Sequence, residues 1–183
     1  MRLPRWLITL LAIAADDGRP VPSRIHLEKL LFLIEKELKE IEKKINFKTY
    51  NFIPYKYGPF SDGVYDDIEF LKSKGLIEEG EGGVFYITKR GKSVAKKAIE
   101  KGFVDKKIKQ KIDILKKFVL AKDIDSLLFY IYTRFPEYAI KSEIKERILR
   151  RGEVKKYLGI AGPPSENEYD ALHDEELPHE EKS

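Results

Sequence analysis

The sequence contains no cysteine, and it has only one methionine, one tryptophan and three histidines. Without cysteine the chain cannot form a disulfide scaffold, a thiolate zinc site or a cysteine nucleophile. His26 stands alone and His173 and His179 lie near the end of the chain, so the sequence predicts no metal site and no cofactor. The charged fraction of 36%, rich in lysine and glutamate, is typical of a heat-adapted intracellular protein.

No apolar run is long enough to cross a bilayer, which takes roughly 20 residues. The most apolar stretch, residues 6–15, follows a basic start and contains an Ala-Ile-Ala sequence similar to a signal-peptidase site, so export is one interpretation. The other interpretation is a buried first helix begun by Pro4. We favour the second one because organised helical patterns follow directly, and we expect a cytoplasmic protein without a membrane partner.

Charge is unevenly distributed along the chain. Residues 163–183 carry eight acids and one base, whereas residues 1–162 carry 34 bases and 23 acids. A body with a net charge of +11 attracts polyanions, and an acidic end can compete with them for the same surface. The alternative is that the end of the chain, from residue 161, is simply a disordered solubilising tail.

Apolar spacing, capping residues and turn residues predict a mainly α-helical protein with a small β-hairpin. Residues 47–57 suggest an extended segment followed by a turn at Gly58-Pro59. The hairpin joins Leu76-Ile77 to residues 84–87 around an acidic, glycine-rich tip, and we see no internal repeat. The predicted helices cover residues 5–15, 25–45, 62–73, 89–101, 105–120, 123–134 and 142–150.

This element order is that of a winged helix-turn-helix. Leu71, Gly75 and Leu76-Ile77, followed by the run from Val84 to Thr88 and by Gly91, resemble the third helix, wing and exit helix of PadR-type and multiple-antibiotic-resistance-type regulators. The resemblance implies a winged-helix domain at 1–102 with a helical extension at 103–160, and it implies double-stranded DNA as the partner. Winged helices also mediate protein contacts, so the fold alone does not decide the function.

A second resemblance covers about residues 26–70. Lys29-Leu30-Leu31-Phe32, then Tyr57-Gly58-Pro59, then Val64-Tyr65 resemble the Panacea-type, phage-associated antitoxin domain. This likeness implies contacts with a toxin-like protein partner. It makes the acidic helix and the preceding turn the alternative partner-binding site, with Tyr57, Asp62, Asp66 and Asp67 as its residues. The aromatic residues around Tyr57 can stack on bases or on a partner, or they can pack in the core.

The predicted third helix and the wing tip are acidic and would repel phosphates, whereas residues 89–117 contain twelve bases and three acids. We therefore expect phosphate contacts from the exit helix, with two lysines of the third helix beside it. The alternatives are a solvated, heat-adapted surface or an acidic protein partner. The predicted DNA-binding residues are Lys72, Lys74, Lys89, Arg90, Lys92, Lys96, Lys97 and Lys101.

No residue pattern recommends catalysis. Asp66, Asp67 and Glu69 could serve a metal or acid–base chemistry, but three acids on one exposed helix more often form a solvated face. The glycines at 80, 82 and 83 lack the following Lys-Ser/Thr of a phosphate loop. The apolar stripes of the helices after residue 103 suggest a self-complementary face, so we expect a homodimer.

Overall fold

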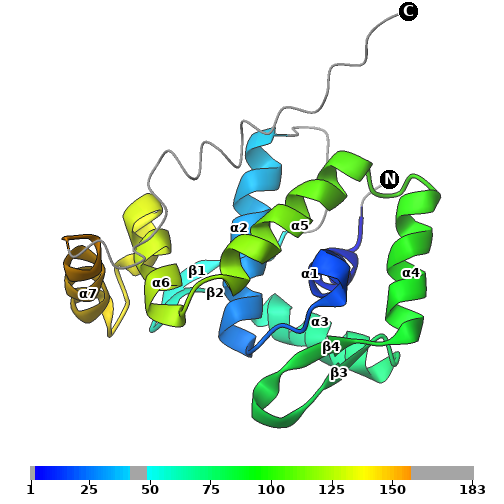
Figure 1. The fold of residues 1–183 in the computed structure, drawn as a ribbon, viewed down its shortest axis with the longest axis horizontal. Coiled ribbons are helices and arrows are strands. Elements are labelled where there is room, and N and C mark those ends of the chain that lie inside the picture. The colour runs from blue at the N-terminus through cyan, green and yellow to red at the C-terminus, as the bar shows by residue number, and fades with distance from the viewer. Residues whose placement is uncertain (1–2, 42–48, 158–183) are drawn as a thin grey trace, which may run out of the picture.

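The computed structural model describes residues 3–41 and 49–157, and the predicted acidic tail lies outside the described residues. The described part is mainly helical with two small antiparallel hairpins (Figure 1). Its helices are α1 (Arg5–Gly18), α2 (Arg24–Ile41), α3 (Asp62–Ser73), α4 (Lys89–Glu100), α5 (Lys106–Leu120), α6 (Ile124–Arg134) and α7 (Lys145–Tyr157). Its strands are β1 (Ile53–Tyr55), β2 (Gly58–Phe60), β3 (Ile77–Glu79) and β4 (Phe85–Ile87), and short 3-10 turns cover Glu81–Gly83 and Pro136–Ala139.

Local capping explains where these helices begin. The side chains of Ser61, Thr88, Asp105 and Asp123 each accept a hydrogen bond from a backbone N–H in the first turn of α3, α4, α5 and α6. Helix α3 ends before Gly75, which has a φ of +63°. The predicted first and last residues of α3, α4, α5 and α6 are thereby confirmed to within about two residues. Helix α7 begins later and extends further than the predicted 142–150.

The turn after α1 is also at the predicted place. Ala15 leaves the helical conformation, and Asp16, Asp17 and Gly18 all have positive φ angles. This turn leads to Val21, which exchanges two backbone hydrogen bonds with Phe85 at 2.9 and 3.0 Å. Strand β4 therefore lies between Val21 and β3, with which it forms the hairpin expected from the sequence.

The first hairpin differs from the prediction. Gly58 and Pro59 lie inside β2, opposite Tyr55 and Pro54, and the chain turns at Lys56-Tyr57 instead. A buried lysine on α2 accounts for the position of this strand. The ammonium group of Lys29 donates to the Pro59 carbonyl at 2.7 Å and pairs with Glu28 at 2.9 Å. Satisfying that buried charge requires the Pro59 carbonyl to face α2, which sequence spacing alone does not reveal.

A single apolar core extends from Leu3 to Ile148 and includes the inner faces of α5 and α6. In Figure 1, α1 lies at the centre, between α2, α4 and α5. Helix α5 packs on both α1 and α2, so the predicted extension shares its core with the predicted winged-helix domain. Its apolar stripe (Ile108, Ile112, Leu115 and Val119) is buried within the chain. The stripe therefore offers no free self-complementary face, and the homodimer stays a prediction.

A buried polar network connects α1 to α3. The guanidinium group of Arg5 donates to both carboxylate oxygens of Asp67 at 3.0–3.1 Å, and the Thr9 hydroxyl donates to the same carboxylate at 2.8 Å. The Tyr50 hydroxyl lies 2.7 Å from that of Thr9. The Asp67 side chain is only 7% exposed, whereas that of Asp66 is 75% exposed. The placement of Asp67 on an exposed, partner-binding face is therefore wrong, because its carboxylate is buried and fully engaged.

These neighbouring aspartates give a stability test. We expect Asp67→Ala to lower the free energy of unfolding by about 3 kcal/mol, because it leaves the Arg5 charge without its buried partner. Asp66→Ala removes the same group one residue earlier, where the exposed carboxylate lies 3.7 Å from Arg5, and should change stability by about 0.5 kcal/mol or less. Urea denaturation of both variants measures the difference. Equal effects would contradict a structural role for the Asp67 carboxylate.

Candidate nucleic-acid interface on helix α4

Helix α4 contacts the body through residues with small or no side chains. Gly91, Ala95 and Ala98 are its buried positions. A Cβ atom at Gly91 would lie 2.0 Å from the carbonyl oxygen of Leu76, so only glycine permits this approach to the segment between α3 and β3. Because its inner face has such short side chains, α4 lies close to the body at these three points. Val94 and Ile99 pack against the core beside them, and the charged side chains of α4 are exposed.

The outer face of α4 carries two rows of cations, all of them exposed. Three- and four-residue spacing places Lys89, Lys92 and Lys96 along one side of the helix. The same helical repeat places three more bases along the other side. The second row consists of Arg90, Lys97 and Lys101. Ser93, also exposed, lies between the two rows.

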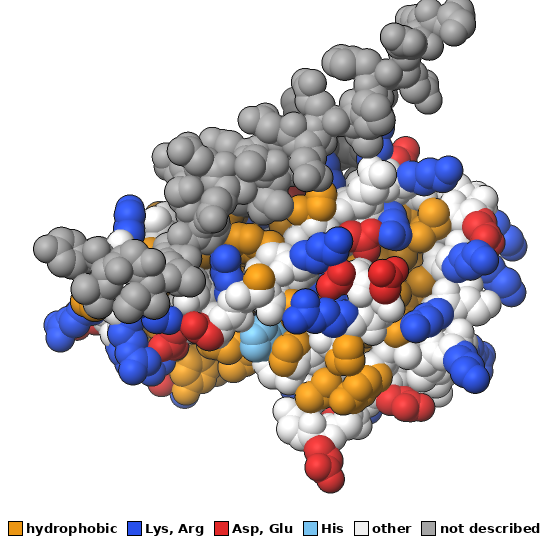
Figure 2. Space-filling view, in the orientation of Figure 1, with side chains coloured by type: hydrophobic (Ala, Val, Ile, Leu, Met, Phe, Trp, Pro, Cys, Tyr) orange, Lys and Arg blue, Asp and Glu red, His pale blue; other side chains and the backbone are white. Residues whose placement is uncertain are grey.

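Most of these charges are not neutralised. Within the described residues, Lys96 is the one cation of the two rows that has an ion pair, at 3.6 Å from the exposed Glu100. The two predicted DNA-binding lysines near α3 differ: Lys72 pairs with Glu69 and Glu79, and Lys74 lies over the Phe70 ring. Figure 2 shows blue side chains gathered around the end of the molecule that α4 occupies. The structure thus separates the eight predicted residues into a set of six at α4, of which only Lys96 has an ion pair within the described residues, and an engaged pair near α3.

The part of the predicted basic segment that lies on α5 differs from the part on α4. Lys109 forms an ion pair with Asp113, and Lys117 lies 4.0 Å from Asp16. Lys116 is completely buried, and its ammonium group donates to the carbonyls of Ile13 and Ala15 at 2.7 and 2.8 Å. It therefore caps the carboxyl end of α1 rather than contributing to a surface. Burial lowers the pKa of Lys116 to about 8, although Asp16 and Asp113 act in the opposite direction.

The surface of α3 and the second hairpin remains acidic. Asp62, Asp66 and Glu69 are exposed on α3, as are Glu78 and Glu81 near the hairpin tip. Glu79 is the exception, since it accepts hydrogen bonds from Lys72 and Arg24, which hold its pKa below the ordinary value. These pairs connect the hairpin to α2 and α3. The expectation that this surface repels phosphates agrees with its charge.

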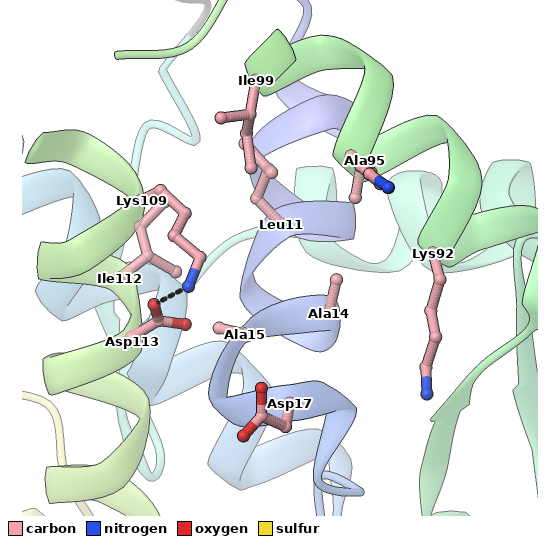
Figure 3. Close-up of a pocket in the computed structure, with 11 residues that line it drawn as sticks. Leu11, Ala14, Ala15, Asp17, Lys92, Ala95, Ile99, Lys109, Ile112 and Asp113 are labelled. Atoms are coloured by element: carbon pink, nitrogen blue, oxygen red, sulfur yellow. Dashed lines mark hydrogen bonds and ion pairs between the residues drawn. The ribbon is translucent and has the colours of Figure 1, made fainter. Parts of the chain in front are cut away.

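A groove of about 430 Å³ runs between α1, α4 and α5, with Lys92 and Lys96 of the first basic row on its rim. Figure 3 shows its apolar floor, formed by Leu11, Ala14 and Ile99 among others. Two carboxylates also line it: Asp113, paired with Lys109, and the exposed Asp17 at the end of α1. The groove therefore carries both signs of charge.

The alternative partner-binding residues lie around the first hairpin. Tyr57 is 49% exposed, and Ile53 and Tyr55 on the same hairpin are 52% and 45% exposed. The neighbouring aromatic residues Tyr50 and Phe52 are buried, as core packing requires. Lys29 and Pro59, from the first and second parts of the Panacea-like pattern, contact each other directly. That contact gives these two residues a structural role, while Tyr57 remains accessible.

Sequence reasoning missed the buried cations Lys29 and Lys116. Each follows the apolar spacing of its helix, which was the one available signal that it faces inward. Among the described residues, no group of three His, Cys, Asp or Glu side chains comes together as a metal site. Within the same ranges, no helix has both the length and the apolarity needed to cross a bilayer. Comparison with protein-family models, curated proteins and solved structures finds no match to this chain.

The buried Lys116 predicts a specific pH dependence of stability. Its folded-state pKa of about 8 lies below the ordinary lysine value of 10.5, so between these two pH values the unfolded chain holds more of the proton than the folded chain does. The contribution of Lys116 to stability therefore rises through this window and is constant below it. Relative to Lys116→Met, the wild type should gain about 2–3 kcal/mol between pH 7 and pH 10. Denaturation of both proteins at both pH values measures this, and Lys117→Met, at an exposed position, should show no such gain.

Proposed function

We propose that this protein binds duplex DNA through helix α4, as a regulator-like factor whose affinity comes mainly from phosphate contacts. The observation that carries this proposal is the pair of cation rows on α4. Five of their six charges have no ion pair within the described residues. Lysines on a merely solvated, heat-adapted surface are commonly interspersed with carboxylates, as Lys109 and Lys117 of α5 are beside Asp113 and Asp16. An unneutralised row instead attracts phosphates and displaces their counterions.

The spacing of the two rows suits a duplex. The major groove of B-DNA is about 12 Å wide, admits one α-helix and has a phosphate strand on each side. A helix with cations along both sides and a small polar residue, Ser93, between them matches that arrangement. Contacts of this kind position a protein on DNA without reading its sequence. We therefore propose a weak dependence of affinity on base sequence.

A winged-helix arrangement is part of the proposal. Helices α1, α2 and α3 are followed by the β3–β4 hairpin, and Val21 between α1 and α2 pairs with β4. This order and pairing support the resemblance to PadR-type and multiple-antibiotic-resistance-type regulators. The acidic surface of α3 is the departure from such regulators. In this chain the exit helix, rather than the third helix, has the charge needed to approach DNA.

Charge removal from α4 tests this proposal. The triple variant Arg90→Ala/Lys92→Ala/Lys97→Ala should weaken binding to random duplex DNA, because three phosphate contacts are lost. The slope of log affinity against log salt concentration should become shallower by about 3. Fluorescence anisotropy with a labelled duplex, from about 50 mM salt upward, measures both quantities.

A matched control separates a specific surface from net charge. Lys145, Arg150 and Lys156 are exposed on α7, at the opposite end of the molecule from α4 (Figure 1). Their replacement by alanine also removes two lysines and one arginine, and it should leave the salt slope unchanged. Equal losses of DNA affinity in both triple variants would show that binding depends on the overall charge and not on α4. Absence of wild-type binding at about 50 mM salt would overturn the proposal.

The second candidate function is binding of a basic protein partner, as the Panacea-like pattern implies. The observation that favours it is the exposed apolar group Ile53, Tyr55 and Tyr57 on the hairpin that precedes α3, a helix with exposed acids at Asp62 and Asp66. Exposed aromatic residues are common at protein interfaces. This surface does not include α4, so the two candidate functions involve different residues.

Co-expression with a toxic product of a neighbouring gene tests the second function. If the partner is a basic toxin, Asp66→Lys should abolish growth protection because it places like charges opposite each other. Glu153→Lys, on the exposed face of α7, makes the same charge change elsewhere and should preserve protection. Protection that survives Asp66→Lys and Tyr57→Ala, but is lost with the α4 triple variant, would assign the activity to the basic rows instead.

A further inference from the structure

A second groove, on the other side of α4, has a different chemistry from the one in Figure 3. It lies between α4 and the start of α1 and has a volume of about 340 Å³. We call it the Trp6 groove. It is lined by Leu3, Pro4, Trp6, Leu7, Val94, Lys97, Ala98, Lys101 and Phe103. No carboxylate is among these residues, whereas Asp17 and Asp113 line the first groove.

The apolar walls of the Trp6 groove are held in place from both sides. Trp6 packs against Phe70, with ring centroids 5.5 Å apart. Phe103 follows a turn in which Gly102 has a φ of +72°, and its backbone N–H donates to the Ala98 carbonyl at 3.0 Å. The next residue, Val104, is buried in the core. Phe103 itself is nevertheless 46% exposed, so the turn fixes an aromatic side chain at the groove rather than burying it.

The polar groups of this groove are both ammonium groups. Lys97 and Lys101 are one turn apart on α4, both are exposed, and neither has an ion pair within the described residues. Sites for small ligands have volumes of roughly 300–1,000 Å³, apolar walls and a few polar groups that set orientation. The Trp6 groove meets each of these conditions, at the lower end of the volume range. Its charge is complementary to one anionic group at the end of an apolar body.

We infer that the Trp6 groove is a binding site for a free aliphatic carboxylate, with the hydrocarbon chain between Trp6, Val94 and Phe103 and the carboxylate at Lys97 and Lys101. The apolar body covers the exposed faces of the two aromatic residues, which supplies most of the affinity. The two ammonium groups select an anion over a neutral or cationic head. This inference goes beyond the proposed DNA binding and does not depend on it, because the ligand is recognised in the absence of nucleic acid.

The only tryptophan of the chain lines this groove, so its fluorescence reports occupancy directly. Decanoate, kept below micelle-forming concentrations, should produce a saturable blue shift of Trp6 emission in the full-length protein. Decanol should bind about fivefold more weakly, since it lacks the ion pairs with two exposed lysines. Decyltrimethylammonium should cause no saturable change, because like charges meet at the rim.

Variants locate the site. Lys97→Gln/Lys101→Gln should weaken decanoate binding about fivefold and bring it close to the affinity for decanol. Lys92→Gln/Lys96→Gln removes two charges from the other side of α4 and should leave binding unchanged. All four positions are exposed, so an unchanged melting temperature is expected and should be verified. Phe103→Ala should weaken decanoate and decanol by the same factor, since it removes only an apolar wall.

Three results would overturn the inference. The first is a decanoate titration without saturation. The second is an equal response to decanoate and to the cationic analogue, which would indicate nonspecific adsorption to an apolar surface. The third is a Trp6 response to anionic phospholipid vesicles but not to free decanoate, which would make the region a membrane contact. None of these measurements includes DNA, so their outcome is independent of the DNA-binding tests.

Discussion

The close contact of α4 with the body is the constraint on which both surfaces of this helix depend. Gly91 allows the helix to begin against the Leu76 carbonyl, and Ala95 and Ala98 continue the contact along its length. Larger residues at these positions would move α4 outward and fill the space beside it. Small residues instead leave a groove on each side of the helix, while the helical repeat places all six cations on the exposed face. The basic rows and the two grooves are thus arranged around one packing contact.

Cations serve two opposite purposes in this molecule. Lys29, Lys116 and the guanidinium group of Arg5 are buried or nearly so, and each is satisfied by carbonyls or a carboxylate that belongs to another segment. They connect the hairpin to α2, α5 to the end of α1, and α1 to α3. The cations of α4 have no such partners in the described part of the chain and remain available to an external anion. Burying an unpaired charge is costly, so each buried cation has its partners within the fold, whereas an exposed cation needs none.

Much of the secondary structure could be predicted because it depends on neighbouring residues. The caps at Ser61, Thr88, Asp105 and Asp123, the turn at Asp16-Asp17-Gly18 and the β3–β4 hairpin all follow from local hydrogen bonding and backbone preference. The β1–β2 hairpin was missed because a long-range contact with Lys29 decides its position. Asp67 follows the apolar spacing of α3, between Val64 and Leu71, but its partners Arg5 and Thr9 are distant in sequence, so its burial was missed.

The amino-acid sequence by itself determined the mainly helical character, the order of most elements, and the presence of an acidic third helix before a basic exit helix. These properties follow from composition and from interactions a few residues apart. Only the tertiary structure decided which lysines are free, because pairing and burial depend on residues as distant in sequence as Ile13 and Lys116. It also decided that the grooves beside α4 exist and that just one of them lacks a carboxylate. Those features arise between segments, where no local pattern records them.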